Sequence, residues 1–224
     1  MVKFENVTKK FGSTKALEDV SFDIEEGDFI FLTGHSGAGK TTLLKLLLRE
    51  LKPDSGKIII DGVDIATLKK REVPFYRRKL GIVFQDFKLL YDRTVYENVE
   101  LALEVAGDKE KRVEKIKKAL EEVGLSDKAN LFPRQLSGGE LQRAVIARAI
   151  VSNPKLIIAD EPTGNLDPVT SRQIVDLLNK ATDSNTTVIM ATHNENIVNS
   201  LKRRVINLKE GKLSSDKKAA RYEE

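Results

Sequence analysis

One stretch of nine residues, Gly34–Thr42, restricts the possible folds more than any other part of the chain. It reads Gly-His-Ser-Gly-Ala-Gly-Lys-Thr-Thr and matches the pattern G-x-x-x-x-G-K-[ST]. An apolar, β-rich run, Phe29–Thr33, precedes it, and good helix formers, Leu43–Leu48, follow it. A strand, a glycine-rich turn and a helix in this order direct backbone N–H groups toward phosphate. The stretch predicts a nucleotide-binding loop, and the alternative is an ordinary glycine turn before a core helix.

This segment, the phosphate loop, has side chains suited to a nucleotide. Lys40 is its only side-chain cation and would reach the β- and γ-phosphates, and the Thr41 hydroxyl would coordinate Mg²⁺. The glycines let the backbone curve around an anion with no Cβ in the way. Lys40 is therefore also a predicted catalytic residue. The predicted nucleotide contacts are Gly34, His35, Ser36, Gly37, Ala38, Gly39, Lys40, Thr41 and Thr42.

Length and composition favour one globular domain. The 224 residues are enough for a sizeable core, with room for an inserted subdomain. Hydrophobic residues make up 40% and charged residues 32%, which fits a soluble protein with a charged surface. No apolar run approaches the roughly 20 residues that a membrane span needs, and the N-terminus lacks the apolar core of a signal peptide. The absence of cysteine excludes disulfides and thiolate metal sites and fits a reducing cytosol.

The charge balance gives no indication of nucleic acid. The net charge of +4 is the remainder of 38 basic and 34 acidic residues, so we expect no nucleic-acid partner. Basic clusters occur at Lys69–Arg71, Arg77–Lys79 and Lys202–Arg204. Such runs are usually solvated faces, and contact with anionic lipid headgroups is the alternative.

The first residues have the pattern of β-structure. Val2–Val7 alternates like an edge strand, and Ala16–Ile24 forms a second strand after a turn at Gly12. Phe11 lies just before that turn. Its ring would either pack in the core or provide the flat apolar surface on which adenine stacks.

Polar residues follow two further apolar strands. Gln85 comes directly after Leu80–Phe84, at the strand end where ligands bind in α/β sheets, or it is simply a loop residue. Asp160 and Glu161 end the run that begins at Lys155. Because successive strand residues point to opposite faces, the two carboxylates can divide two roles. Asp160 would hold the hydrated Mg²⁺, and Glu161 would orient or deprotonate the attacking water.

Two other segments are candidates for phosphate contact. Ser137-Gly138-Gly139-Glu140 leads into a helical run and forms either a second anion site or a plain helix N-cap with Glu140 three residues after the serine. His193 follows the strand Thr187–Thr192 and would either touch a γ-phosphate or act as a capping or core histidine.

The order of these motifs resembles that of ABC-type ATPases over almost the whole chain. The segments that match are Gly34–Thr42, Gln85, Leu136–Glu140, Asp160-Glu161, Asp167 and His193. Leu-Ser-Gly-Gly is the specific one, and we refer to Ser137–Glu140 as the signature turn. Two residues depart from the family pattern: Leu141 replaces a usual glutamine, and Phe11 stands where many members have tyrosine.

This resemblance implies an α/β fold, a phosphate-loop NTPase core of the ABC nucleotide-binding type. It would carry an N-terminal antiparallel β subdomain and an inserted α-helical subdomain. We expect the ATPase core in residues 1–85 and 150–213, the helical insertion in 86–149, and a flexible polar tail in 214–224.

The resemblance also implies ATP hydrolysis, with ATP and Mg²⁺ as cofactors, by two copies paired head to tail. The signature turn of each copy would cover the γ-phosphate held at Lys40 of the other. Gln85 would sense nucleotide and Mg²⁺ and count as a metal contact, Asp167 would contact the nucleotide, and His193 would be a switch residue at the γ-phosphate.

Other segments resemble the cell-division ATPases within this family, whose partner is the membrane protein FtsX. They are Arg71–Phe75, Phe84–Leu90 and Asp92–Val99, together with Leu32–Lys40 around the phosphate loop. This implies an FtsX-like integral membrane subunit and a peripheral position on the cytoplasmic side of the cell membrane. ATPases of lipoprotein release and macrolide export share Gly164–Asp167 and are the alternative. A soluble nucleotide switch acting on nucleic acid is a further hypothesis, against which stand the single ATPase unit and the lack of a long coiled-coil insertion.

Overall fold

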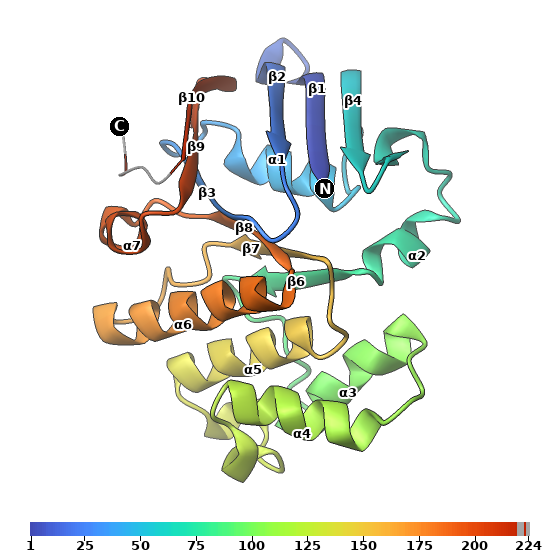
Figure 1. The fold of residues 1–224 in the computed structure, drawn as a ribbon, viewed down its shortest axis with the longest axis vertical. Helices are drawn as coiled ribbons and strands as arrows, with labels where there is room; N and C mark the ends of the chain where they lie inside the picture. The colour runs from blue at the N-terminus through green and yellow to red at the C-terminus, as the bar shows by residue number, and fades with distance from the viewer. Residues whose placement is uncertain (219–221, 223–224) are drawn as a thin grey trace. The chain divides into compact units, whose positions relative to one another are not determined.

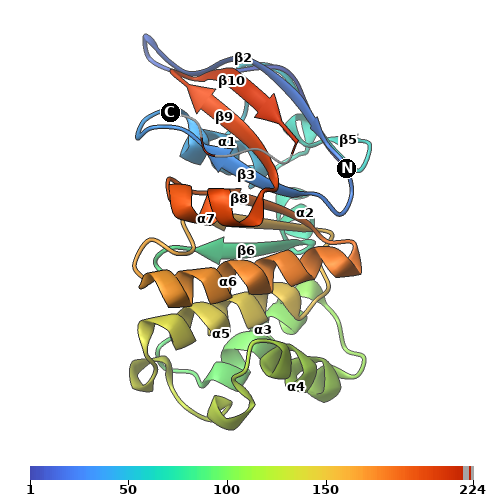
Figure 2. The ribbon, with the colours of Figure 1, turned by 60° about the vertical axis from the view of Figure 1, so that its left-hand side comes forward.

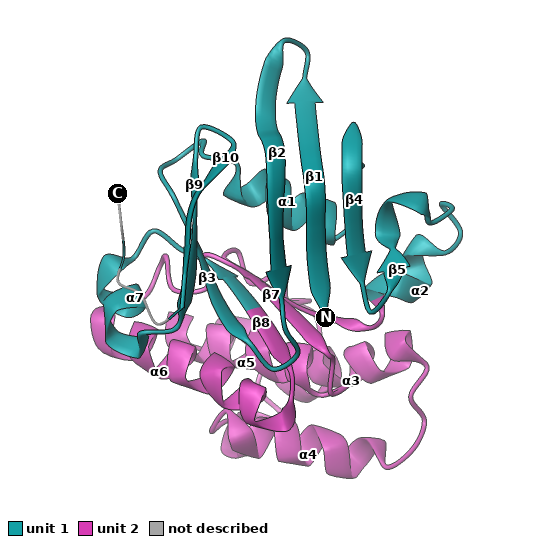
Figure 3. Ribbon diagram, turned by 45° about the horizontal axis from the view of Figure 1, so that its top comes forward, with its two compact units in different colours: residues 1–77, 189–224 teal, residues 78–188 magenta. Residues whose placement is uncertain are grey.

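A computed structural model of the protein describes residues 1–218 and Tyr222 (Figure 1). It contains two compact units, which Figure 3 shows in different colours. Unit 1 comprises residues 1–77 and 189–224, and unit 2 comprises residues 78–188. The phosphate loop lies in unit 1, and the signature turn and the Asp160-Glu161 pair lie in unit 2.

An antiparallel sheet in unit 1 has the strand order β2-β1-β4-β5. Its strands are β1 (Val2–Phe11), β2 (Thr14–Ile24), β4 (Ser55–Ile60) and β5 (Val63–Asp64). The rings of Phe4 and Phe22 stack 4.5 Å apart between β1 and β2. The predicted edge position of the first strand is wrong, because Val2 pairs with Ile24 on one side and with Ile60 on the other.

The second set of strands in unit 1 has the order β10-β9-β3-β8 (Figure 2). It consists of β3 (Phe29–Thr33), β9 (Arg204–Lys209), β10 (Lys212–Lys217) and the end of β8 (Thr187–Ala191). All five residues of β3 are buried, as expected for a strand in the middle of a sheet. The helices of this unit are α1 (Lys40–Leu47), α2 (Val73–Arg77), α7 (Glu195–Leu201) and the 3-10 turn η1 (Ile65–Thr67).

The predicted polar tail begins later than residue 214. Strand β10 continues to Lys217, which pairs with Val205 of β9. Arg204 donates to both carboxylate oxygens of Asp216, at 2.8 and 2.7 Å. This bidentate pair favours pairing in a segment of low intrinsic β-propensity. Of the predicted tail, residues 219–221 and 223–224 lie outside the described residues.

Unit 2 combines parallel strands with helices. Strands β6 (Leu80–Phe84) and β7 (Leu156–Asp160) pair in parallel, and the N–H of Thr187 at the start of β8 donates to Lys155 O at 2.8 Å. The helices are α3 (Val95–Ala106), α4 (Arg112–Glu122), α5 (Gly138–Ile150), α6 (Pro168–Lys180) and the 3-10 turns η2 (Ser126–Lys128), η3 (Pro133–Gln135) and η4 (Ala181–Ser184). This mixture of strands and helices agrees with the predicted α/β class.

Local sequence explains where these helices begin and end. Thr94 and Glu97 form a capping box at the start of α3, and Gly107 ends that helix in the left-handed conformation. Gly124 follows α4 with a φ of 68°, the left-handed conformation that glycine commonly adopts just after a helix. Helix α6 begins at Pro168, directly after its N-cap Asp167, because the fixed φ of proline suits the first turn of a helix. No helix within the described residues has the length and apolarity that crossing a membrane requires.

Candidate nucleotide-binding site

The phosphate loop is wrapped around the side chain of Lys40. The Lys40 Nζ atom donates to Gly34 O at 2.5 Å and to His35 O at 3.2 Å, and Ala38 N donates to His35 O at 3.1 Å. The ammonium group therefore lies along the inner side of the turn. No described side chain caps the start of α1, whose N-cap residue is Gly39, so its first N–H groups remain available to an anion.

Two glycines fix the course of this loop. A Cβ at Gly34 would lie 2.3 Å from Leu208 O, and a Cβ at Gly39 would lie 2.6 Å from Ala16 O. Both glycines also have positive φ, 139° and 108°. Any larger residue would push the loop away from β9 or β2, so close backbone approach explains the glycines at these positions.

Two more of the predicted site residues lie in unit 1. The ring of Phe11 is 50% exposed, with Lys9 Nζ 5.6 Å from its centroid, which does not fit the core-packing alternative. The side chain of His193 is exposed and follows Thr192, whose N–H donates to Leu32 O at 3.1 Å. Because Leu32 is one residue from the end of β3, His193 lies at the same edge of the sheet as the phosphate loop.

Unit 2 brings Gln85 close to the chain segment that carries Asp160 and Glu161. Asp160 at the end of β7 pairs with Phe84, the residue before Gln85. A Cβ at Gly164 would lie 2.8 Å from Gln85 Nε2, so the Gln85 side chain reaches the turn that follows Glu161. Glu161 has a φ of 47°, a left-handed conformation that is strained for a residue with a side chain. Such strain is typical of functional sites, where the surrounding structure holds it in place.

The signature turn is a capping box at the N-terminus of α5. Ser137 N donates to Glu140 Oε2 at 2.8 Å, Glu140 N donates to Ser137 Oγ at 3.4 Å, and Lys128 Nζ donates to Glu140 Oε1. The ion pair with Lys128, together with the bonds from Ser137, lowers the pKa of Glu140 to about 2. The predicted N-cap is therefore confirmed, and Glu140 is a charged carboxylate at neutral pH.

Asp167 lies beside this turn and caps the next helix. A Cβ at Gly139 would lie 2.6 Å from Thr170 Cγ2, so the turn touches the first turn of α6. Asp167 accepts from the N–H groups of Val169 and Thr170, both at 3.0 Å, and from the Thr170 hydroxyl at 2.5 Å. The bond from the Thr170 hydroxyl is the main cause of its lowered pKa. The observed role of Asp167 is thus structural, and its predicted nucleotide contact remains a prediction.

Two residues not singled out from the sequence hold the loop after Gln85. Fully buried Asn98 accepts from Leu90 N at 2.8 Å and donates to Leu90 O at 3.0 Å. Arg148 in α5 donates to Lys88 O at 2.6 Å and to Phe87 O at 3.0 Å. Phe87 and Lys88 both have positive φ, 58° and 49°. For Asn98 the signal in the sequence is a polar residue on the otherwise apolar face of α3 formed by Val95, Val99 and Leu103.

The residues present fit Mg²⁺ bound through a nucleotide. Within the described residues, no three His, Asp or Glu side chains cluster as a protein metal cage would require. Mg²⁺ in nucleotide sites takes only one or two protein ligands besides phosphate and water. The exposed Thr41 hydroxyl at the start of α1 and the Asp160 carboxylate at the end of β7 are ligands of this kind.

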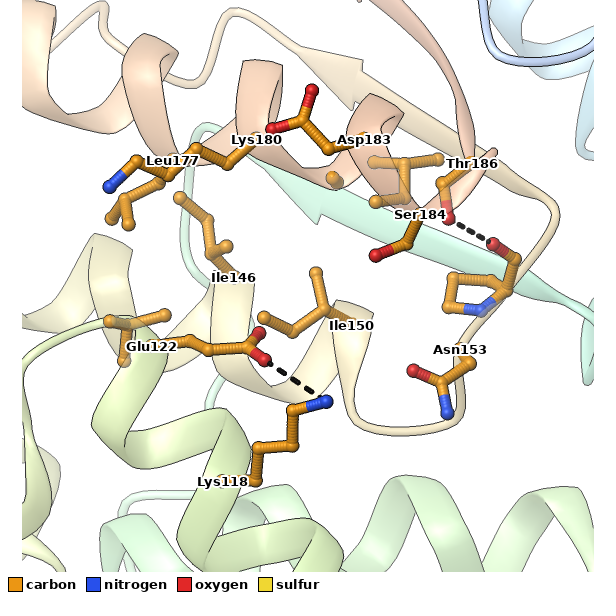
Figure 4. Close-up of a pocket in the computed structure, with 14 residues that line it drawn as sticks. Lys118, Glu122, Ile146, Ile150, Asn153, Leu177, Lys180, Asp183, Ser184 and Thr186 are labelled. Carbon is orange, nitrogen blue, oxygen red and sulfur yellow. Dashed lines mark hydrogen bonds and ion pairs between the residues drawn. The ribbon is translucent and has the colours of Figure 1, made fainter.

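A pocket of about 370 Å³ in unit 2 is separate from these residues (Figure 4). It lies among α4, α5 and α6, and Figure 4 shows Ile146 and Ile150 projecting into it. At its rim Lys118 pairs with Glu122 at 3.7 Å. None of the predicted site residues lines it.

Comparison with known proteins gives consistent results. The sequence profile of the family described as ABC transporter matches residues 17–164. The cell division ATP-binding protein FtsE of Bacillus subtilis is 49% identical over 224 residues, 99% of this chain and 98% of its own. The protein of the same name from Escherichia coli K12 is 49% identical over 215 residues, covering 95% of this chain and 97% of its own.

Solved structures resemble this chain in fold as well as in sequence. A dimeric ATP-binding cassette, MJ0796, in a post-hydrolysis state bound to ADP and Pi, has a TM-score of 0.87 at 38% identity, covering 99% of this chain and 100% of its own. CbiO1 from Clostridium perfringens, part of the ABC transporter complex cbiONQ, has a TM-score of 0.89 at 30% identity, covering 97% and 88%. These cassettes confirm the nucleotide-binding-domain architecture predicted from the sequence.

Proposed function

Because the chain belongs to the ABC transporter family, we propose that it is the ATP-hydrolysing subunit of a membrane complex acting in cell division. The main support for ATP binding is the phosphate loop. There the ammonium group of Lys40 and the uncapped N-terminus of α1 lie at the same turn. The cell-division role rests on relatives of that name that are 46–49% identical over nearly the full chain. They favour this role over lipoprotein release or macrolide export.

Each predicted residue has a chemical task in the hydrolysis of ATP to ADP and phosphate. Lys40 and the loop N–H groups bind the β- and γ-phosphates, while Thr41 and Asp160 hold Mg²⁺. The chemistry that bound Mg²⁺ supplies is neutralisation of phosphate charge. Glu161 orients the attacking water and accepts its proton. Gln85, beside the turn after Glu161, and His193 report whether the γ-phosphate is present.

Two copies of the chain form the active unit in this proposal, paired head to tail. Each signature turn then covers the γ-phosphate bound at the partner's phosphate loop. The exposed ring of Phe11 stacks on adenine, and Asp167 comes close to the nucleotide from the start of α6, which it caps. The dimeric state named for MJ0796, bound to ADP and Pi, supports the pairing of two copies.

A bulky cation at Ser137 should separate ATP binding from hydrolysis. Ser137→Arg leaves the phosphate loop intact, so we expect ATP affinity to stay at the wild-type value. The arginine blocks the turn that receives the partner's phosphate, so phosphate release should fall at least about a hundredfold. Equilibrium ATP binding and steady-state phosphate release measured on the same sample check this. The shared-site arrangement is wrong if this variant hydrolyses ATP as fast as the wild type.

The membrane partner in this proposal is an FtsX-like integral membrane subunit, which holds the chain on the cytoplasmic side of the cell membrane. A groove for one of its cytoplasmic helices would be formed by Asp86–Tyr91, which follows Gln85 and so couples nucleotide state to the partner. Leu89 is buried and belongs to the local core, whereas Leu90 is 39% exposed.

We also propose that the chain is divided into an ATPase core, residues 1–85 and 150–213, and a helical insertion, residues 86–149.

Capture of the membrane subunit tests this role. We expect the tagged chain, purified from detergent-solubilised membranes, to bring down one integral membrane protein. Leu90→Asp should reduce that protein at least about tenfold while ATP binding and the melting temperature stay unchanged, because the side chain is exposed. Val63→Asp, at a valine in β5 that is 50% exposed, serves as the control. Capture of DNA or RNA instead of a membrane protein would contradict the proposal.

A further inference from the structure

The carboxylate of Glu140 lies where negative charge opposes the binding of phosphate to the signature turn. It is the acidic residue in the first turn of α5, and its side chain is only 16% exposed. A carboxylate there competes with phosphate for the positive end of the helix and repels it. Its Oε2 atom accepts a hydrogen bond from Ser137 N at 2.8 Å. Oε1 is therefore the oxygen that needs a counter-charge.

Lys128 supplies that counter-charge from outside the helix. Its Nζ donates to Glu140 Oε1, and its side chain is 32% exposed, so the pair is partly shielded from solvent. The backbone of Lys128 is fixed on both sides, since its N–H donates to Leu125 O and its carbonyl accepts from Leu131 N, each at 3.0 Å. The backbone of this short turn is therefore held in place, and the bond to Glu140 Oε1 keeps the ammonium group against the carboxylate.

We propose that Lys128 is a positioning residue for the signature turn. By neutralising Glu140, it lets the capping box form without leaving a net negative charge where the partner's γ-phosphate must bind. This inference rests on the proposed function, because it requires the turn to receive a phosphate from a second copy. In this proposal Lys128 acts through Glu140 and not by direct contact with nucleotide or metal.

The test uses ATP-dependent dimerisation in the Glu161→Gln chain, which is expected to retain ATP. We expect Lys128→Met in that background to weaken the dimer about tenfold, with ATP binding to the single chain unchanged, since an uncompensated charge remains at the turn. Adding Glu140→Gln should restore dimerisation, because the amide oxygen still accepts from Ser137 N and carries no charge. Lys115→Met is the matched control: Lys115 is 30% exposed and pairs with Asp108, away from the turn.

The outcomes separate this inference from the proposed function. A Glu161→Gln chain that does not dimerise with ATP overturns both. If that chain dimerises and Lys128→Met dimerises equally well, only the inference is overturned. If Glu140→Gln does not restore dimerisation to Lys128→Met, Lys128 has only a structural role. That result also overturns the inference. If Lys128→Met does not fold, the test uses Glu140→Gln in the Glu161→Gln chain without the lysine change. The inference requires this chain to dimerise at least as well as Glu161→Gln, and weaker dimerisation overturns it.

Discussion

Lys40→Ala should reduce ATP affinity at least about a hundredfold. Lys40 is the only cation among the side chains of the phosphate loop, and its ammonium lies against Gly34 O and His35 O, at the inner side of the turn. Charge-assisted contacts with phosphate are among the strongest that a single side chain makes. A hundredfold loss corresponds to about 2.7 kcal/mol.

Thermal unfolding with and without Mg-ATP measures this effect. At ATP a hundredfold above its Kd, the wild-type chain gains about 2.7 kcal/mol, or roughly 5–10 °C in a chain of this size. The Lys40→Ala chain should show almost no shift. Lys45→Ala, at an exposed lysine in the same helix, should shift as the wild type does. An undiminished shift in Lys40→Ala would remove the basis for the nucleotide site.

Glu161→Gln should slow ATP hydrolysis by about 10²–10⁴-fold and leave ATP binding intact. The amide keeps the shape and one oxygen of the carboxylate but cannot accept the proton of the attacking water. The strained backbone of Glu161, with a φ of 47°, holds this side chain at the end of β7. Because hydrolysis is what reopens the proposed pair, an ATP-bound dimer should accumulate.

Size-exclusion chromatography with light scattering detects that dimer, and phosphate release measures turnover. Glu121→Gln, at an exposed glutamate on α4, is the control and should behave as the wild type in both assays. If the Glu161→Gln chain stays monomeric and hydrolyses ATP at the wild-type rate, another group must accept the proton of the attacking water.

Local sequence was enough to predict the features that depend on neighbouring residues. The phosphate loop follows from glycine spacing between a strand and a helix. The capping role of Ser137 with Glu140 follows from their spacing of three residues. Asp160 was expected at the end of an apolar strand, and β7 ends at that residue.

Features that depend on distant parts of the chain could not be predicted in this way. The interior position of β1 results from pairing with β4, about 50 residues further on. The ion pair of Arg204 with Asp216, which favours the extension of β10 to Lys217, joins residues that are not neighbours in the chain. The bonds from Arg148 to Phe87 and Lys88 join segments about 60 residues apart, and no pattern in either segment indicates them.

Phosphate release from Mg-ATP by the purified chain tests the central claim most directly, when Ser137→Arg is measured beside it. The account predicts that the wild type releases phosphate, and that Ser137→Arg binds ATP equally well but releases phosphate at least about a hundredfold more slowly. A wild-type chain that binds ATP and releases no phosphate at any protein concentration would contradict it, as would equal rates for the two chains.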